Sequence, residues 1–325
     1  MTPPGIFFIV CALLATVNSI IGEETCRQYK SRGYLTADCA EKRLSKLPSD
    51  LKSDTEVLDL SYNLIRELYN NTFSCCTSIQ FLYLQGNAIY EVASHVFAPL
   101  SSLQVLDLNR NVLGEIPKNL PSSLQRLYID ENPPIFKNEP VLEISSLTSL
   151  TVLTSSSQKL QVFPRFDGVI PNLIELNVSN NAFKFITPQD LAPLCQLQFL
   201  RVSGEKLFTD REYQCDCLRF QKWVEDFKIN VDTKVTCSTE KPEACILEHT
   251  NETLQIREKC LSELSARKLP YKLMIGSGII AVILCIGILL YIRHRRRKRN
   301  KSKTVGGQNS RTPSVKYDNK TLEEK

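Results

Sequence analysis

A short phrase recurs along the chain at nearly constant spacing, in forms such as VLDLSYN, FLYLQGN and VLDLNRN. Each copy alternates apolar and polar residues before it reaches an asparagine, which predicts a short strand with one buried face and then a turn. Because no single turn could bury its own apolar face, the repetition predicts stacked turns that share one core. The leucines that align the seven units are Leu58, Leu82, Leu106, Leu127, Leu153, Leu176 and Leu200.

The asparagine that ends the phrase stands where the chain must bend away from the strand. A buried amide at this point can bond the open backbone groups of its own turn and of the next, so the asparagines should stack as a ladder. Gln158 and Glu205 stand at the same point in two degenerate units. The ladder asparagines are Asn63, Asn87, Asn111, Asn132 and Asn181. The later apolar positions, which should line the returning limb of each turn, include Leu68, Phe73, Val92, Phe97, Ile186 and Leu191.

On these residues the chain resembles the leucine-rich repeat family, and the resemblance runs from about Cys26 to Cys260. It implies an α/β fold, a curved solenoid with a parallel sheet on its concave face and a cap at each end. The N-terminal cap reads CRQYKSRGYLTADC, and the C-terminal cap begins CDCLRFQKWVEDF. The disulfides that the family pattern implies are Cys26–Cys39 in the first cap, with Cys215–Cys237 and Cys217–Cys260 in the second.

The sequence also predicts the role of the tryptophan in the C-terminal cap and the positions of the remaining exported cysteines. Trp223 falls where such caps keep a packing residue, and Cys245 departs from the family pattern. Cys76 takes the place of a core leucine, so Cys75 should point outward. Cys195 lies about five strands from Cys75, too far for a bond at ~4.8 Å per strand. A bond between Cys195 and Cys245 is possible, because both are near the C-terminal cap.

Two apolar runs indicate the cellular location of the repeats. The first, IFFIVCALLATV, is too short to span a bilayer and predicts a signal peptide. The second, residues 273–292, has no charge over 20 residues, about one bilayer core at ~1.5 Å per residue, and the basic cluster RHRRRKRNKSK follows it. Such a cluster stays cytoplasmic, so we expect a single-pass type I protein of the plasma membrane, with its N-terminus extracellular.

This organisation divides the chain into seven segments. They are a signal peptide at 1–22, an N-terminal cysteine cap at 23–54, about seven repeats at 55–210, a C-terminal cysteine cap at 211–262, a juxtamembrane linker at 263–272, a transmembrane helix at 273–292 and a basic disordered tail at 293–325.

The formal net charge of +5 is concentrated in that tail. Residues 293–325 hold 12 Lys and Arg against 3 acidic residues, or +9, which leaves 28 basic and 32 acidic residues, or −4, for the rest. The positive charge therefore indicates membrane orientation and contact with anionic lipid, worth ~1 kcal/mol per basic residue near the surface. Because the basic residues are concentrated in the tail, the net charge does not indicate a nucleic-acid partner.

No catalytic constellation is found. The three histidines, His95, His249 and His294, stand on unconnected segments, and the chain has no HExxH, no GxSxG and no phosphate-binding glycine loop. The clustered cysteines have the context of disulfides rather than of zinc. We therefore expect a protein that is not an enzyme and that uses no cofactor or metal.

The wording of the C-terminal cap, directly followed by an apolar span, makes the exported part similar to a shortened Toll-like receptor without the cytoplasmic Toll/interleukin-1 receptor domain. The resemblance favours a cell-surface receptor or co-receptor that binds a protein ligand through the concave face, in innate immune recognition. The alternative is an adhesion protein or an auxiliary subunit that acts laterally on another membrane protein. No sequence feature separates the two.

Candidate binding residues follow from the repeat alignment, because the side chains that flank the buried leucines face the concave surface. We predict that Phe81, Tyr83, Arg126 and Tyr128 bind the ligand, since aromatic and arginine side chains dominate interface hot spots. An alternative is that these side chains only cover the sheet.

The sequence also contains candidate sites for glycosylation, phosphorylation and self-association. Sequons predict glycans at Asn70, Asn177 and Asn251, and a glycan on Asn177 would confine the ligand to the N-terminal half of the sheet. Tyr317, followed by Asp318 and Asn319, resembles the docking sequence of SH2-type adaptors once phosphorylated. The small residues that share one face of the apolar span, and would allow a homodimer, are Ser277, Ala281 and Cys285.

Overall fold

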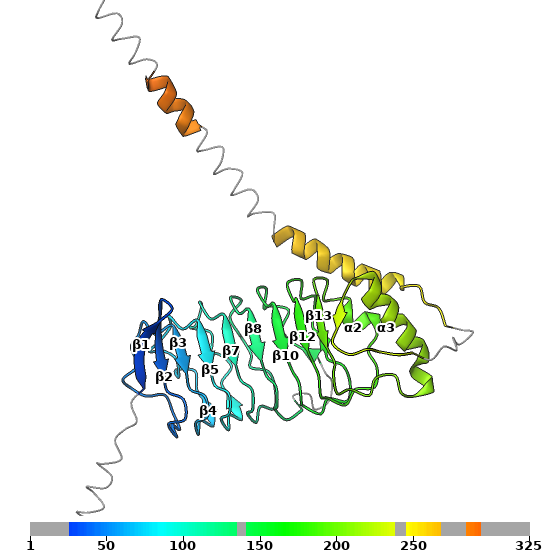
Figure 1. Cartoon of the computed structure of the whole chain (residues 1–325). Coiled ribbons are helices and arrows are strands. Elements are labelled where there is room, and N and C mark those ends of the chain that lie inside the picture. The colour runs from blue at the N-terminus through cyan, green and yellow to red at the C-terminus, as the bar shows by residue number, and fades with distance from the viewer. Residues whose placement is uncertain (1–25, 135–140, 238–244, 268–283, 294–325) are drawn as a thin grey trace, which may run out of the picture. The chain divides into compact units, whose positions relative to one another are not determined.

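In the computed structural model of the chain, ten strands lie side by side in one sheet (Figure 1). The structure describes residues 26–134, 141–237, 245–267 and 284–293. Residues up to Leu264 form one compact unit, and those from Ser265 form a second, so each is described by itself. The signal peptide and Tyr317 lie outside the described residues.

The sheet is parallel except at its N-terminal edge, where β1 runs antiparallel to β2. Neighbouring repeats are in register, so that Leu58 lies opposite Leu82 and Leu82 opposite Leu106. The seven predicted repeats are therefore confirmed as seven strands of this sheet: β3, β5, β7, β8, β10, β12 and β13. In sheet order the strands are β1 (Arg27–Ser31), β2 (Tyr34–Asp38), β3 (Val57–Asp59), β5 (Phe81–Tyr83), β7 (Val105–Asp107), β8 (Arg126–Tyr128), β10 (Val152–Thr154), β12 (Glu175–Asn177), β13 (Phe199–Arg201) and β14 (Asn230–Val231).

The returning limbs contain less helix than the predicted α/β class implies. In the described part of the repeats they hold short strands, many tight turns and one four-residue helix, α2 (Pro188–Leu191). Prolines at 99, 117, 121, 164 and 193 interrupt these limbs, and proline cannot donate a hydrogen bond inside a helix. The short strands are β4 (Glu67–Leu68), which pairs with β6 (Glu91–Val92), and β9 (Val141–Leu142), which pairs with β11 (Arg165–Phe166).

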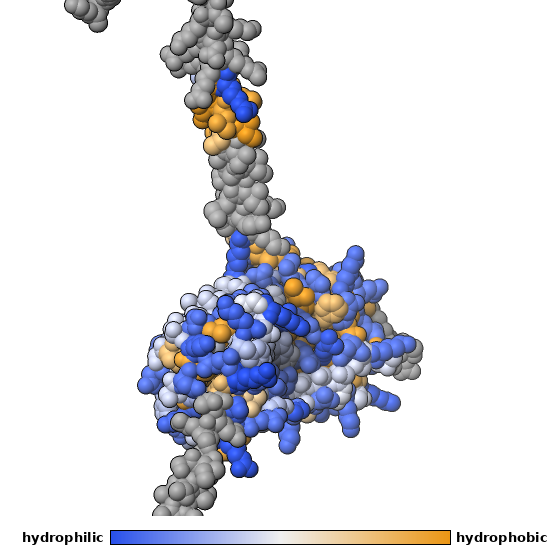
Figure 2. Space-filling view, turned by 60° about the vertical axis from the view of Figure 1, so that its left-hand side comes forward, coloured by the Kyte–Doolittle hydropathy of each residue, from blue (hydrophilic) through white to orange (hydrophobic). Residues whose placement is uncertain are grey.

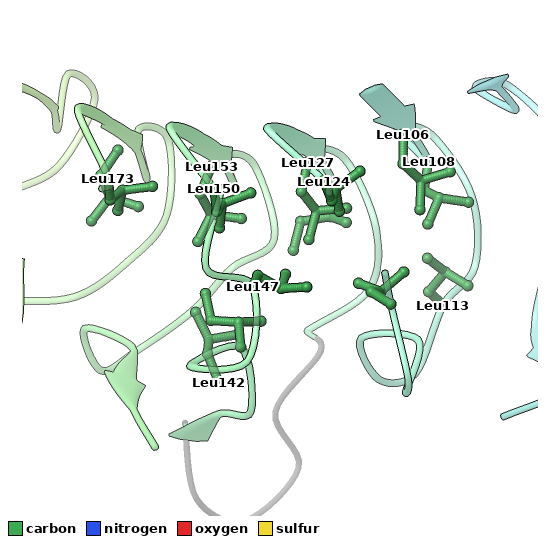
Figure 3. Packing of buried hydrophobic residues seen from close by; sticks show 14 of the residues in the cluster. Leu106, Leu108, Leu113, Leu124, Leu127, Leu142, Leu147, Leu150, Leu153 and Leu173 are labelled. Atoms are coloured by element: carbon green, nitrogen blue, oxygen red, sulfur yellow. The ribbon is translucent and has the colours of Figure 1, made fainter. Parts of the chain in front are cut away.

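The core runs along the inside of the stacked turns. Figure 3 shows leucines of successive strands, such as Leu106, Leu127 and Leu153, pointing inward beside one another. On the returning side Phe73 and Phe97 are fully buried and stack with ring centroids 5.9 Å apart. Each turn thus covers the apolar surface of its neighbour, as the repeat pattern predicts.

The predicted asparagine ladder is confirmed. The Asn111 Nδ2 donates to the carbonyls of Leu84 and Leu108, each at 3.0 Å, and its Oδ1 accepts the Ile89 N–H at 3.0 Å. Each amide therefore joins its own turn to the preceding one. Gln158 continues the ladder, because its Nε2 donates to the carbonyl of Ile129.

Glu205 ends the ladder with a carboxyl group instead of an amide. One oxygen, Oε1, accepts the Asn181 N–H, while the buried Oε2 has no hydrogen-bond partner among the described residues. Burial raises the pKa of Glu205 to about 7, against the opposing effect of the backbone N–H groups of Asn181 and Phe183. A carboxylate cannot donate a proton as the other members of the ladder do, so the protonated form fits this position better.

The residue before each ladder position has a positive φ. Only two of the seven are glycines, and the other five are residues that pay a steric penalty in the left-handed region. These residues are Tyr62 (φ 54°), Gly86 (68°), Arg110 (54°), Glu131 (54°), Ser157 (56°), Asn180 (55°) and Gly204 (82°).

The N-terminal cap is closed by the predicted Cys26–Cys39 disulfide. Figure 2, turned towards this end of the solenoid, shows a mostly hydrophilic surface with scattered apolar spots. In the first repeat Cys76 is buried and Cys75 is exposed, as predicted, and the two are bonded to each other.

The pairing in the C-terminal cap differs from the family pattern. The implied bonds Cys215–Cys237 and Cys217–Cys260 are wrong, and so is the bond between Cys195 and Cys245 that was left open. The observed disulfides are Cys215–Cys245, Cys217–Cys237 and Cys195–Cys260.

The reason lies in the directions in which the cap helices present their cysteines. On α3 (Gln214–Asp226), which follows the short 3-10 turn η1 (Arg211–Tyr213), Cys215 and Cys217 point about 200° apart. Because β14 joins the sheet beside β13, the chain that follows it brings Cys237 to the buried Cys217. A helix that begins at residue 251 packs Cys260 against Cys195 in the last repeat. Trp223 is fully buried beside Phe227, which confirms its packing role.

The expected membrane span falls only partly within the described residues. Residues 284–293 are helical, and Figure 2 shows apolar side chains over this segment. Residues 273–283 lie outside the described part. In the ranges that are described, none of the helices combines the length and the apolar content needed to cross a bilayer.

Replacing Asn111 by alanine should destabilise the solenoid by about 3 kcal/mol, because it leaves buried carbonyl and N–H groups unpaired. Urea unfolding of the full-length protein measures the change. The exposed Gln161→Ala serves as the control and should be nearly neutral. Equal stability of both variants would show that the ladder contributes little.

Replacing Glu205 by glutamine should change how stability depends on pH. The folded pKa of about 7 lies above the unfolded value of 4.5, so the stabilising contribution of the carboxyl group is complete below pH 4.5 and is lost as pH rises through 7. The neutral amide avoids this loss. Glu205→Gln should therefore be more stable than the parent at pH 8, by about 1–2 kcal/mol after allowance for partial exposure, and similar to it at pH 4.5.

Thermal melts at pH 4.5, 6 and 8 would measure this difference, with the exposed Glu115→Gln as a matched control. A melting temperature that responds to pH identically in Glu205→Gln and in the parent would contradict the assignment.

Replacing both Cys195 and Cys260 by serine should lower the free energy of unfolding by about 4 kcal/mol. These cysteines are 65 residues apart, and a loop of this length loses much entropy when it is closed in the unfolded chain. Peptide mapping without reduction should recover the Cys195–Cys260 bond from the parent. Recovery of a peptide pair linked by Cys217–Cys260 instead would contradict the observed bond and support the family pairing.

Candidate functional site

The outer surface of the repeat strands, here called the sheet face, is formed by the residues on either side of each buried leucine. Alternation along a strand directs these side chains away from the core, and the parallel register aligns them into two columns. The first column is Val57, Phe81, Val105, Arg126, Val152, Glu175 and Phe199, and the second is Asp59, Tyr83, Asp107, Tyr128, Thr154, Asn177 and Arg201.

The four predicted binding residues all lie on the sheet face, on strands β5 and β8. Phe81, Tyr83 and Tyr128 are half-buried, and Arg126 is exposed. The two strands are separated by β7, so the pairs are about 10 Å apart at ~4.8 Å per strand. The two pairs are therefore separated by one intervening strand.

Asp107 fills that gap, and the sequence-based selection of binding residues missed it. It lies opposite Tyr83 on one side and Tyr128 on the other. The alternation of aspartate and tyrosine along the second column could have identified it. The sequence of its own strand could not show that Asp107 lies between two aromatic rings.

The surroundings of Asp107 alter its acidity. The pKa of its carboxyl group is raised to about 6. Burial is the largest cause, the nearby Asp130 and Asp59 also raise the pKa, and the Asn109 N–H lowers it. The pKa of Tyr83 is also raised, mainly by burial and then by Asp59 and Asp107. The carboxyl groups of Asp59 and Asp130 thus lie close enough to Asp107 to raise its pKa.

The aspartates of the second column use one oxygen to shape the end of their strand. The Oδ1 of Asp59 accepts the Ser61 N–H at 2.9 Å, and that of Asp107 accepts the Asn109 N–H at 3.0 Å. Their Oδ2 atoms accept no hydrogen bond from the described residues. Each aspartate therefore keeps one acceptor for a ligand.

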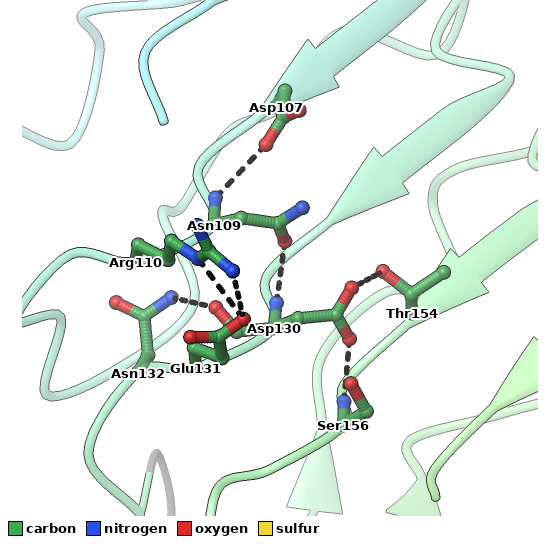
Figure 4. A network of polar contacts seen from close by, with 8 residues as sticks. All are labelled: Asp107, Asn109, Arg110, Asp130, Glu131, Asn132, Thr154 and Ser156. Atoms are coloured by element: carbon green, nitrogen blue, oxygen red, sulfur yellow. Dashed lines mark hydrogen bonds and ion pairs between the residues drawn. The ribbon is translucent and has the colours of Figure 1, made fainter. Parts of the chain in front are cut away.

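Beyond Asp107 the acidic groups already have partners (Figure 4). Asp130 accepts the Thr154 hydroxyl and the Ser156 N–H, each at 2.6 Å. Arg110 and Glu131 form an ion pair at 3.0 Å. This network stiffens the turn that follows the strands and leaves little free charge.

The C-terminal end of the sheet face is also paired internally. Glu175 and Arg201 form an ion pair at 2.7 Å across β12 and β13. Asn177, which lies opposite Arg201, accepts both the N–H and the hydroxyl of Ser179. Glycosylation at Asn177 stays a prediction, as it does at Asn70 and Asn251, whose side chains are exposed.

Two leucine-rich repeat family models match the chain, one at residues 52–89 and the other at residues 102–127. The first match contains β3 and β5, and the second contains β7 and ends at Leu127 within β8. Of the predicted binding residues, Tyr128 lies just beyond the second match, and the other three lie inside the matched ranges. Leucine-rich repeat domains usually mediate protein–protein interaction and are typically scaffolds without enzymatic activity. The chain thus contains leucine-rich repeats, folded into a parallel-sheet solenoid of about seven turns whose exposed sheet face suits protein binding.

Proposed function

We propose that this protein is a cell-surface receptor or co-receptor that captures a protein ligand on the N-terminal half of its sheet face. The observation that carries the proposal is the run of half-buried aromatic and charged side chains on adjacent strands of that face. Its setting, by resemblance to a shortened Toll-like receptor, is innate immune recognition.

The aromatic side chains on this face have the character of binding anchors. Phe81 packs edge to face against Tyr34, with ring centroids 5.3 Å apart, so it loses little freedom when a ligand arrives. The hydroxyls of Tyr83 and Tyr128 make no hydrogen bond to the described residues. They are available to a partner, and tyrosine is enriched among interface hot spots.

The repeat strands supply a rigid support for these anchors. Each strand is fixed at both edges by neighbouring strands and from inside by the ladder amides. Side chains on such elements hold their geometry better than side chains on loops. A ligand therefore meets a preorganised surface.

Attachment to a membrane is part of the proposal. In the described helix at residues 284–293, large apolar side chains are exposed, for example Leu284 at 61% and Leu289 at 62%. Side chains of this kind are stable in lipid, and the basic cluster that follows favours the cytoplasmic side. The basic tail would also contact anionic lipid.

Replacing Tyr83 and Tyr128 together by alanine should reduce ligand capture about tenfold or more, because hot-spot tyrosines contribute about 1–2 kcal/mol or more each. The full-length protein is displayed on cells, partners are crosslinked at the surface, and captured proteins are identified and quantified.

The matched control is Tyr69→Ala with Tyr90→Ala, since both tyrosines are exposed outside the sheet face. It should leave capture intact. If the sheet-face variant folds and captures its partner as well as the parent does, the sheet face is not the site. Recovery of one constant membrane protein from both variants would favour an auxiliary subunit.

A further inference from the structure

We infer that the partner presents a lysine- or arginine-rich segment to the N-terminal half of the sheet face. The inference rests on the proposed function and adds the chemical class of the ligand segment. It follows from the charge and geometry of the second column.

The charge of this region is unbalanced. From β2 to β8 the two columns hold three carboxylates, Asp38, Asp59 and Asp107, since Asp38 extends the second column opposite Asp59. Their one cation is Arg126, at the far edge. A cationic segment would complement this surface, and complementary charge guides both encounter and register.

The tyrosines provide a second kind of contact for the same cations. Tyr83 lies between Asp59 and Asp107, and Tyr128 lies beyond Asp107. At ~4.8 Å between strands, a guanidinium or ammonium group bound to Asp107 comes within reach of both rings. Contacts between cations and ring faces extend to about 6 Å.

The spacing of the aspartates defines the spacing of the cations. Asp59 and Asp107 are two strands apart, about 10 Å. In a polyproline II helix, side chains three residues apart point the same way and are about 9.3 Å apart. A segment with a basic residue at every third position would therefore place one cation on each aspartate.

Bound cations would also relieve the electrostatic strain at Asp107. Tyr83 and Tyr128 lie opposite it, Arg126 lies opposite Val105 on the same strand, and the carboxylates of Asp59 and Asp130 repel it. Its pKa of about 6 means that it loses negative charge as pH falls through this value. Affinity for a cationic peptide should therefore be lower at pH 5 than at pH 7.5.

The rest of the sheet face does not offer the same charge. Asp130 is bound by Thr154 and Ser156, and Glu175 is paired with Arg201. In the first column, Arg126 on β8 stands between Glu175 on β12 and the strands nearer the N-terminus. The cationic segment is thus confined to β2–β8.

The test measures binding of a labelled Pro-Pro-Arg repeat peptide to the full-length protein in non-ionic detergent, by fluorescence anisotropy. The double variant Asp59→Asn, Asp107→Asn should have an affinity for the peptide that is lower by about tenfold or more. Asparagine keeps the Oδ1 acceptor that shapes the strand end, as Asn177 does for the Ser179 N–H at 3.1 Å. The variant should therefore fold.

Three controls sharpen the result. A Pro-Pro-Glu peptide should not bind, Glu175→Gln should leave affinity unchanged, and Arg126→Gln should strengthen binding. Equal affinity of the double variant and the parent for the arginine peptide, or equal binding of both peptides, would overturn the inference.

Capture of the cellular partner separates this inference from the proposed function. If the double tyrosine variant loses the partner and the double aspartate variant keeps it, the sheet face is the site and its ligand is not cationic. If both variants keep the partner, the sheet face is not the site and both proposals fail.

Discussion

The turns of the solenoid leave backbone N–H and C=O groups inside the protein, and the ladder amides that follow the repeat strands pair them. Asn111 shows the arrangement, with two donated bonds and one accepted bond that join its own turn to the preceding one. An unpaired buried group would cost about 1–3 kcal/mol. Because every amide spans two turns, the ladder also maintains the register of neighbouring strands.

The backbone just before each ladder amide is strained, which shows how strongly the amide position is constrained. The residue before each amide adopts a positive φ, even where it is an arginine, a glutamate or a tyrosine, at a cost on the order of 1 kcal/mol. At Gly86 a side chain would also strike the ring of Tyr62 in the preceding turn. The turns accept this strain because the amide must point inward.

The same register creates the sheet face. Aspartate at the second column has two roles, since Oδ1 of Asp59 or Asp107 closes the strand end and Oδ2 accepts no hydrogen bond from the described residues. Three residues per strand leave room for two outward side chains, so the surface chemistry is set by very few positions. Asp107 lies between Tyr83 and Tyr128, and burial is the largest cause that raises its pKa to about 6.

Much of the candidate site could be predicted from the repeat alignment. It identified Tyr83 and Tyr128 as outward-facing residues of one column, because alternation along each strand dictates which side chains leave the core. It did not identify Asp107 as the residue that links them. Its burial depends on rings contributed by β5 and β8, more than 20 residues away in either direction along the chain.

The sequence by itself determined the solenoid, because a repeated period of apolar residues has one way to share a core. It also determined the Cys26–Cys39 bond, whose partners stand in one short cap. Only the tertiary structure decided the partner of Cys260. That cysteine lies on a helix that folds back on the last repeat, and a disulfide requires its two cysteines to meet in space.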